Sequence, residues 1–418
     1  MQVISVKKAL SLVQKTRKNQ NQKLVQAIID NVAKKGDAAL LEFEKKFNGV
    51  VVKNLLVSKK EIAEAYKLVT KDQINSIIEA KNRLTKTELA LKKQLGKITV
   101  NVGGAKITKS FEPLEIVGCY VPGGLARYPS SAIMSIVPAK LAGVRTIIVA
   151  TPPNKQAKID PLVLVAADIC GANMILKAGG AHAIAALAFG TKSVPQVDKI
   201  VGPGGAFVTT AKHLVNDIAS IDMLAGPTEL VILADESADP RLVALDLISQ
   251  AEHSSDTKCH LITTSKNLAN KVVSEITNLL YVIPRREIVQ SSLQKNGFIA
   301  VGSMPEAILL ANKIAPEHIQ IMTKNQNKIA QKIKTAGLIL VGQNTPSAAS
   351  DYLLGTNHIL PTGRFGRSRG SLSILDFVKI RTSIDSSRQA LQKINKHLKI
   401  LTESENLPNH YNAIKGRL

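Results

Sequence analysis

The sequence predicts an α/β fold with two parallel-sheet domains and small helical segments at the two ends of the chain. Three observations predict it. Short apolar runs rich in β-branched residues alternate with helical stretches of about ten to fifteen residues, as in parallel sheets covered by helices. The alternation comes in two series, within residues 146–215 and from residue 229 onward, so we expect two sheets. A length of 418 residues also suits two or three domains.

The first hundred residues are predicted to be mostly helical. We expect a short amphipathic helix over the first twenty residues, which lack the apolar stretch and cleavage site of a secretion signal. Ser58 and Glu61 have the spacing of a capping box, and apolar residues then recur at helical intervals to about Leu95. Around Lys97 the pattern changes to alternating β-branched residues and glycine turns, which indicates strands.

The first α/β series has glycine turns at the starts of its helices. Gly179-Gly180 and residues 202–205 follow predicted strands, and backbone N–H groups at such turns can hold a phosphate, although glycine pairs also simply make tight turns. No G-x-G-x-x-G follows any strand, so the expected domains are Rossmann-like but incomplete. The predicted strands of this series are Thr146–Ala150, Met174–Ala178 and Lys199–Val201.

The second α/β series begins at residue 229. From about Ile384 the chain is predicted to form a helical appendage with a polar end. The predicted elements of the second series are a strand at Glu229–Ala234, a helix from about Pro240 to His253, and strands at His260–Thr264, Phe298–Val301 and Leu338–Val341.

Composition and charge exclude several classes of protein. No run approaches the roughly 20 apolar residues that span a bilayer, so we expect a cytoplasmic protein without a membrane partner. The net charge of +23 permits nucleic-acid binding. However, the lysines are spread along the chain and there is no Trp, so we predict no nucleic-acid partner. Three cysteines without C-x-x-C spacing argue against disulfides and a thiolate metal site.

Two short clusters carry side chains suited to metal binding or proton transfer. Gln250 and His253 are three residues apart at the end of a predicted helix, so they project from one face. Glu317 and His318 are adjacent at a helix-to-strand transition, where they supply two proton-transfer groups with different pKa values.

Further candidates lie toward the C-terminus. Asp351 and His358 belong to a long polar segment, which in a compact domain is more often functional than structural. Glu405 and His410 follow in the appendage. An Asp and two His could join Gln250 in a zinc site of nitrogen and oxygen ligands, but spacing alone cannot assemble residues so far apart. A surface or core role for each histidine remains the alternative.

Strings of residues along the whole chain resemble the L-histidinol dehydrogenase family, in the order and spacing of that family. The strings are GCYVPGGLARYPSSAIM, AGGAHAIAALAFGT, VGPGGAFVTTAK, IDMLAGPTELVILAD, DLISQAEHSSD, APEHIQI and SDYLLGTNHILPT. The resemblance implies oxidation of L-histidinol to L-histidine through L-histidinal with two NAD⁺, the last step of histidine biosynthesis. It also implies one Zn²⁺ per subunit and a homodimer whose C-terminal segments complete each other's active sites.

The resemblance also implies roles for individual residues. His318 would be the base for both hydride transfers, and Glu317 would activate water for the aldehyde. The implied zinc ligands are Gln250, His253, Asp351 and His410. The implied substrate contacts are Thr228, Gln250, His253, His318, Asp351, His358, Glu405 and His410. The implied NAD contacts are Tyr120, His182 and Gly205, of which the last two stand where the family has Gln and Asn.

We assign residues 1–15 to an N-terminal helical segment, 16–119 with 229–371 to a larger discontinuous domain, 120–228 to an inserted domain, and 372–418 to a C-terminal helical dimerisation segment. Three other functions remain open. They are a zinc-dependent dehydrogenase of another small polyol, a zinc-binding relative with impaired NAD use, and a basic nucleic-acid binder.

Overall fold

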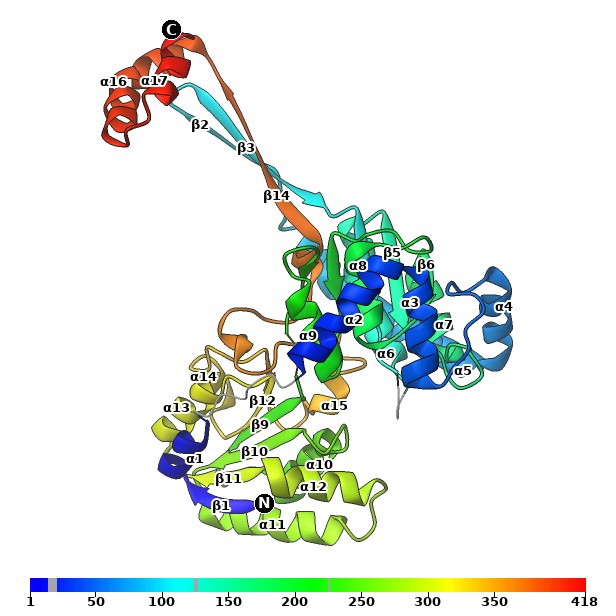
Figure 1. Cartoon of the computed structure of the whole chain (residues 1–418). Coiled ribbons are helices and arrows are strands. Elements are labelled where there is room, and N and C mark those ends of the chain that lie inside the picture. The colour runs from blue at the N-terminus through cyan, green and yellow to red at the C-terminus, as the bar shows by residue number, and fades with distance from the viewer. Residues whose placement is uncertain (14–20, 124–126, 225) are drawn as a thin grey trace.

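The computed structural model contains two parallel β-sheets, each with helices on both faces, and a long arm that extends away from them (Figure 1). The structure describes residues 1–13, 21–123, 127–224 and 226–418. The predicted α/β class with two parallel sheets is therefore confirmed. Among the described residues, no helix combines the length and apolar character needed to cross a membrane.

Sheet A has six parallel strands in the order β1-β11-β10-β9-β12-β13. Helices α10 to α12 cover one face, and α1, α13 and α14 cover the other. The strands are β1 (Gln2–Ser5), β9 (Glu229–Ala234), β10 (Lys258–Thr263), β11 (Phe298–Val301), β12 (His318–Met322) and β13 (Leu338–Val341). The helices are α1 (Val6–Val13), α10 (Pro240–Ala251), α11 (Lys266–Leu279), α12 (Arg286–Asn296), α13 (Met304–Ile314), α14 (Gln326–Ala330) and the short α15 (Ser347–Ser350).

Sheet B has five parallel strands in the order β6-β5-β4-β7-β8. One face packs against α4 to α7 and the other against α2, α3, α8 and α9. The strands are β4 (Ile116–Tyr120), β5 (Thr146–Thr151), β6 (Met174–Lys177), β7 (Lys199–Val201) and β8 (Ser220–Ile221). The helices are α2 (Gln22–Lys35), α3 (Asp37–Phe43), α4 (Lys59–Leu68), α5 (Lys71–Lys92), α6 (Pro129–Ala142), α7 (Pro161–Cys170), α8 (Gly180–Phe189) and α9 (Ala206–Leu214).

The arm is a three-stranded antiparallel sheet that carries two helices at its tip (Figure 1). Its strands come from distant parts of the chain, and the order is β14-β3-β2. The elements are β2 (Ile98–Val102), β3 (Ala105–Pro113), β14 (Val378–Ser386), α16 (Arg388–Ser404) and α17 (Pro408–Lys415).

The packing corrects the expected division into domains. Residues 21–119 were grouped with residues 229–371, but α2 to α5 contribute to the two cores of sheet B, and β4 is its central strand. Residues 359–377 also enter the sheet B core, through Ile359 and Phe377 among others. The physical reason is that both segments bury their apolar faces on a sheet whose other strands, β5 to β8, lie elsewhere in the sequence.

Three local predictions also need correction. Residues 2–5 form an edge strand of sheet A rather than part of a helix, and residues 14–20 of the expected helix lie outside the described residues. The helix expected from Ser58 to Leu95 is two helices, because Thr70 and Gln73 form a second capping box that starts α5. The C-terminal appendage begins with strand β14, paired along its length with β3.

Candidate active site between the two sheets

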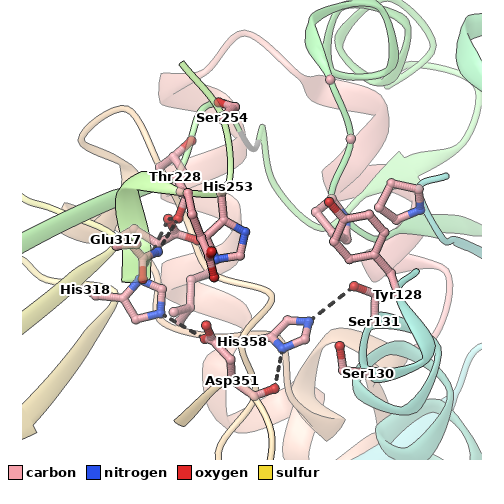
Figure 2. Close-up of a pocket in the computed structure, with 18 of the residues that line it drawn as sticks. Tyr128, Ser130, Ser131, Thr228, His253, Ser254, Glu317, His318, Asp351 and His358 are labelled. Atoms are coloured by element: carbon pink, nitrogen blue, oxygen red, sulfur yellow. Dashed lines mark hydrogen bonds and ion pairs between the residues drawn. The ribbon is translucent and has the colours of Figure 1, made fainter. Parts of the chain in front are cut away.

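A cavity of about 530 Å³ lies between the two sheets (Figure 2). It meets the carboxyl ends of β4 and β7, because Pro122 and Gly123 follow β4, and Gly204 and Gly205 follow β7. After β4 the chain adds β5 and β6 on one side of that strand, and it later adds β7 and β8 on the other side. The boundary between β4 and β7 is therefore the point of sheet B where the strand order reverses. Such switch points are where open α/β sheets bind their ligands.

The opposite wall of the cavity comes from the amino ends of two neighbouring strands of sheet A. Thr228 directly precedes β9, and Glu317 and His318 stand at the start of β12. Two segments that cross between the domains supply further side chains. One crossing follows Met223, which packs in a core of sheet B, and ends at Thr228, and the other, residues 351–358, begins at Asp351 and ends at His358.

Helix α10 places Gln250 and His253 at the cavity. It begins at Asp239, whose carboxylate accepts a hydrogen bond from the backbone N–H of Arg241 (2.8 Å), with Pro240 in the first turn. The helix ends at Ala251, so Gln250 lies in its last turn and His253 in the loop that follows. The two side chains line the same cavity, although the helix predicted to run to about His253 ends two residues before it.

A chain of directed hydrogen bonds fixes Glu317. Gln250 Nε2 donates to Thr228 Oγ1 (2.8 Å), and this hydroxyl in turn donates to Glu317 Oε2 (2.5 Å). The backbone N–H of Glu229 also donates to Glu317 Oε2 (2.9 Å). Burial of the carboxyl nevertheless outweighs these contacts and raises the pKa of Glu317 to about 7. A carboxyl in this state exchanges a proton readily near neutral pH.

His318 is buried and available for proton transfer. Its side chain is 2% exposed, and within the described part of the chain neither ring nitrogen has a hydrogen-bond partner. Nδ1 is 3.8 Å from Glu317 Oε2, and Nε2 is 3.6 Å from Asp351 Oδ1. Burial disfavours the charged ring, but the carboxylates of Glu317 and Asp351 outweigh it and raise the pKa of His318.

The electrostatics of the remaining groups suit a cation site. Burial lowers the pKa of His253, which keeps the imidazole neutral and its lone pair free for a metal. Burial alone would raise the pKa of Asp351, but the nearby ring of His318, whose own pKa is raised, outweighs burial, so the pKa of Asp351 is lowered and its carboxylate is charged. Gln250 Oε1 accepts from Ser347 Oγ (3.0 Å) and still has a second lone pair.

These donors fit three positions of a zinc site. The amide oxygen of Gln250, the imidazole of His253 and the carboxylate of Asp351 are ligand types that Zn²⁺ accepts, and all three side chains line the cavity. In the described residues no three His, Cys, Asp or Glu side chains are grouped to hold a metal ion. The structure therefore brings together an incomplete set of ligands within one chain.

Glu405 and His410, predicted from the C-terminal segment, do not reach the cavity of their own chain. Glu405 follows α16, and His410 lies in α17, so both are at the tip of the arm (Figure 1), and both are exposed. Neither residue lines the cavity. All the other predicted metal and substrate residues do line it.

The three predicted NAD contacts differ in position. Gly205 lines the cavity, and a Cβ atom there would meet nothing within 4 Å. Tyr120 is buried, and its hydroxyl accepts from the backbone N–H of Gly180 (3.0 Å). His182 is also buried, with Nε2 2.8 Å from Glu44 Oε1. Tyr120 and His182 therefore support the Gly179-Gly180 turn, and neither borders the cavity.

Sequence reasoning assigned no role to several residues that line the cavity. Tyr128 and Ser131 come from the start of α6, and Arg285 precedes α12 with a left-handed backbone (φ 56°). Ser131 lies within one of the quoted strings, but no spacing rule distinguishes a helix-start serine that lines a cavity from one that faces solvent. These residues reach the cavity only through the packing of the two domains.

Comparisons with known proteins identify relatives along nearly the whole chain. The sequence profile of a family described as histidinol dehydrogenase matches residues 12–418. Histidinol dehydrogenase of Clostridium acetobutylicum is 43% identical over 396 residues, which is 94% of this chain and 92% of that protein. The corresponding protein of Methanococcus maripaludis is 42% identical over 394 residues, 94% and 92% of the two chains.

A solved structure gives the same result for the fold. The crystal structure of histidinol dehydrogenase from Elizabethkingia anophelis superposes with a TM-score of 0.94 at 32% identity, covering 100% of this chain and 98% of that one. Profile, sequence and structure thus agree over nearly the whole length. The chain is therefore an oxidoreductase that belongs to the histidinol dehydrogenase family.

Proposed function

We propose that the chain oxidises L-histidinol to L-histidine through L-histidinal, with two NAD⁺ as hydride acceptors and one Zn²⁺ per subunit. The balance is one histidinol, two NAD⁺ and one water giving histidine carboxylate, two NADH and three protons. The observation that carries the proposal is the convergence of Thr228, Gln250, Glu317, His318 and Asp351 on one cavity at the switch point of sheet B.

Gln250, His253 and Asp351 would hold the zinc ion together with His410 of a second copy of the chain. Zinc supplies a Lewis-acidic anchor for nitrogen groups of the substrate when it is bound. The neutral ring of His253 and the charged carboxylate of Asp351 support this assignment, because both are in the protonation state that a ligand requires.

His318 would take the proton from the substrate hydroxyl in the first oxidation. Its unpartnered ring nitrogens leave it free to accept that proton, and Asp351 and Glu317 stabilise the imidazolium that results. In the second oxidation His318 would take a proton from the hydrated aldehyde. NAD⁺, when bound, supplies the hydride acceptor in both oxidations.

Glu317 would remove a proton from the water that adds to L-histidinal. Its pKa of about 7 matches that task, because a carboxyl near the working pH can accept and return a proton. The hydroxyl of Thr228 and the backbone N–H of Glu229 direct one carboxylate oxygen, and the other oxygen remains to face the cavity.

A homodimer with shared sites follows from the position of the C-terminal residues. Glu405 and His410 would enter the cavity of the partner, where Glu405 with His358 would recognise the substrate's amine and imidazole. Exposed apolar side chains on the arm support burial against another chain, since Val100, Ile380 and Ile384 are each more than half exposed. We also propose that the enzyme is cytoplasmic.

The test is a count of NADH at 340 nm against L-histidinol consumed, using purified, zinc-loaded protein. Two NADH per histidinol are expected. One NADH per histidinol would refute the second oxidation. Turnover of other small polyols at rates equal to histidinol would instead refute the substrate assignment, because such substrates have no use for both Glu405 and His358.

A further inference from the structure

The segment that carries Asp351 and His358 is a crossing between the two domains. Before it, α15 packs on α10 of the sheet A domain. After it, Ile359 enters the core of sheet B. A crossing of this kind is not part of either sheet, so its position must be fixed by other contacts. The precision with which Asp351 enters the cavity depends on those contacts.

Helices of the sheet B domain supply contacts along the crossing. Asn357 is 2% exposed, and its Nδ2 donates to the backbone carbonyl of Met134 in α6 (2.7 Å). Arg83 in α5 donates through Nη1 to the backbone carbonyl of Leu353 (3.2 Å). The first contact anchors the side chain of Asn357 and the second anchors the backbone at Leu353, and neither involves Asp351 or His358.

A third contact acts on a functional side chain directly. Ser131 is 3% exposed in the first turn of α6, and its Oγ lies 3.3 Å from His358 Nε2 (Figure 2). The other ring nitrogen, Nδ1, lies 2.7 Å from the backbone carbonyl of Asp351. A carbonyl can only accept, so Nδ1 carries a hydrogen, and the lone pair of the neutral ring is on Nε2, facing the Ser131 hydroxyl.

We propose that Ser131 is a positioning residue of the active site. Its hydroxyl holds the ring of His358, and through the bond from Nδ1 to Asp351 it holds the metal-ligand end of the crossing. Helix α6 follows the loop at the carboxyl end of β4, so one serine joins the sheet B wall of the cavity to the zinc half-site. The zinc part of this inference rests on the proposed function.

Ser130 provides a matched control for Ser131. It stands one residue earlier in the same helical turn and also lines the cavity. Figure 2 labels both serines, and among the described contacts no hydrogen bond joins Ser130 to His358, whereas Ser131 makes one. Substitution of either serine by alanine removes one hydroxyl from the same end of α6. Only the substitution of Ser131 removes the hydrogen bond to His358.

The first measurement is backbone hydrogen exchange over residues 350–359 in the full-length protein without added metal. Several amides here are hydrogen-bonded, including those of Asp351 and Leu353, so their exchange reports opening of the crossing. Ser131→Ala should speed this exchange about fivefold, the effect of one lost hydrogen bond. Ser131→Thr, which keeps the hydroxyl, should return the exchange rate to that of the parent protein, and Ser130→Ala should leave the rate unchanged. Equal exchange in Ser131→Ala and the parent protein would overturn the proposal.

The second measurement is the zinc dissociation constant of the same four proteins, by competition with a chelator. Ser131→Ala should raise it about tenfold, the usual effect of losing a group that orients a metal ligand. Faster exchange with unchanged zinc affinity would refute the link to Asp351. Failure of the parent protein to bind zinc would instead count against the proposed metal site, and hydrogen exchange alone would then decide the role of Ser131.

Discussion

The proposed homodimer with shared active sites leads to a quantitative prediction for mixed dimers. His318 lies in the cavity, and His410 lies at the tip of the arm of the same chain. We expect His318→Asn and His410→Ala each to abolish activity as homodimers, because every site would then lack either its base or a zinc ligand. Co-expressed with two different affinity tags, the two variants can be isolated as a dimer containing one of each.

The expected activity of the mixed dimer follows from counting intact sites. One cavity keeps His318 and receives His410 from the partner, whereas the other cavity lacks both. The isolated mixed dimer should therefore have about half the parent activity per dimer, because a twofold dimer has two equivalent sites. NADH formation at 340 nm with saturating L-histidinol measures it, and native mass spectrometry verifies the composition.

The alternative geometry gives a clearly different number. If the arm instead folded back onto its own cavity, both cavities of the mixed dimer would be defective. One would lack His318 and the other would lack His410. The activity of the mixed dimer would then be as low as that of the two inactive variant homodimers. A mixed dimer with no more activity than His318→Asn alone would refute the shared site.

Four further outcomes are expected. Glu317→Gln should slow the aldehyde step far more than the first, so single-turnover kinetics should give one fast and one slow NADH per site; equal slowing of both would contradict the division of roles. Removal of zinc by a chelator should abolish turnover, and added zinc should restore it; activity in metal-free enzyme would rule out the anchoring role. Burial raises the pKa of Asp246 to about 6, so the folded chain binds its proton more tightly than the unfolded chain, and this carboxyl lowers stability increasingly as the pH rises from about 4 to about 6. Asp246→Asn should therefore raise the free energy of unfolding by about 1–3 kcal/mol at pH 7, where the buried carboxylate is charged, and have little effect at pH 4, where the carboxyl is protonated. An equal effect in urea melts at both pH values would show that titration is not the cause. Gly205→Asn should fold with an unchanged melting temperature, since a Cβ there meets no atom within 4 Å, and a shift of several degrees would contradict the open space.

Local sequence patterns predicted most strands of the two sheets. Strands β5, β9 and β11 are short apolar runs between turn residues, and they lie within a residue of the predicted ranges. Such runs are informative because a strand buried on both faces needs apolar side chains at every position. Edge strands lack this requirement, which is why β1 and β14 were not predicted: in β1 only Ile4 is buried, and β14 has no fully buried residue.

The sequence by itself also determined the chemistry available to the site. Gln250 with His253, and Glu317 with His318, are close in the chain, so their proximity follows from a separation of three residues or fewer. Their convergence on Thr228 and Asp351 does not follow, because it requires the strand ends of two separate sheets to meet. Only the tertiary structure decided that the cavity joins the carboxyl ends of sheet B to the amino ends of sheet A.

The tertiary structure likewise decided what the cavity lacks and what supports it. No pattern in the sequence indicates that α6 reaches the segment from Asp351 to His358, or that β14 pairs with β3 and carries His410 away from its own cavity. These contacts join residues more than 200 positions apart. Their energies come from burial and hydrogen bonds between distant segments, which exist only when the whole chain is folded.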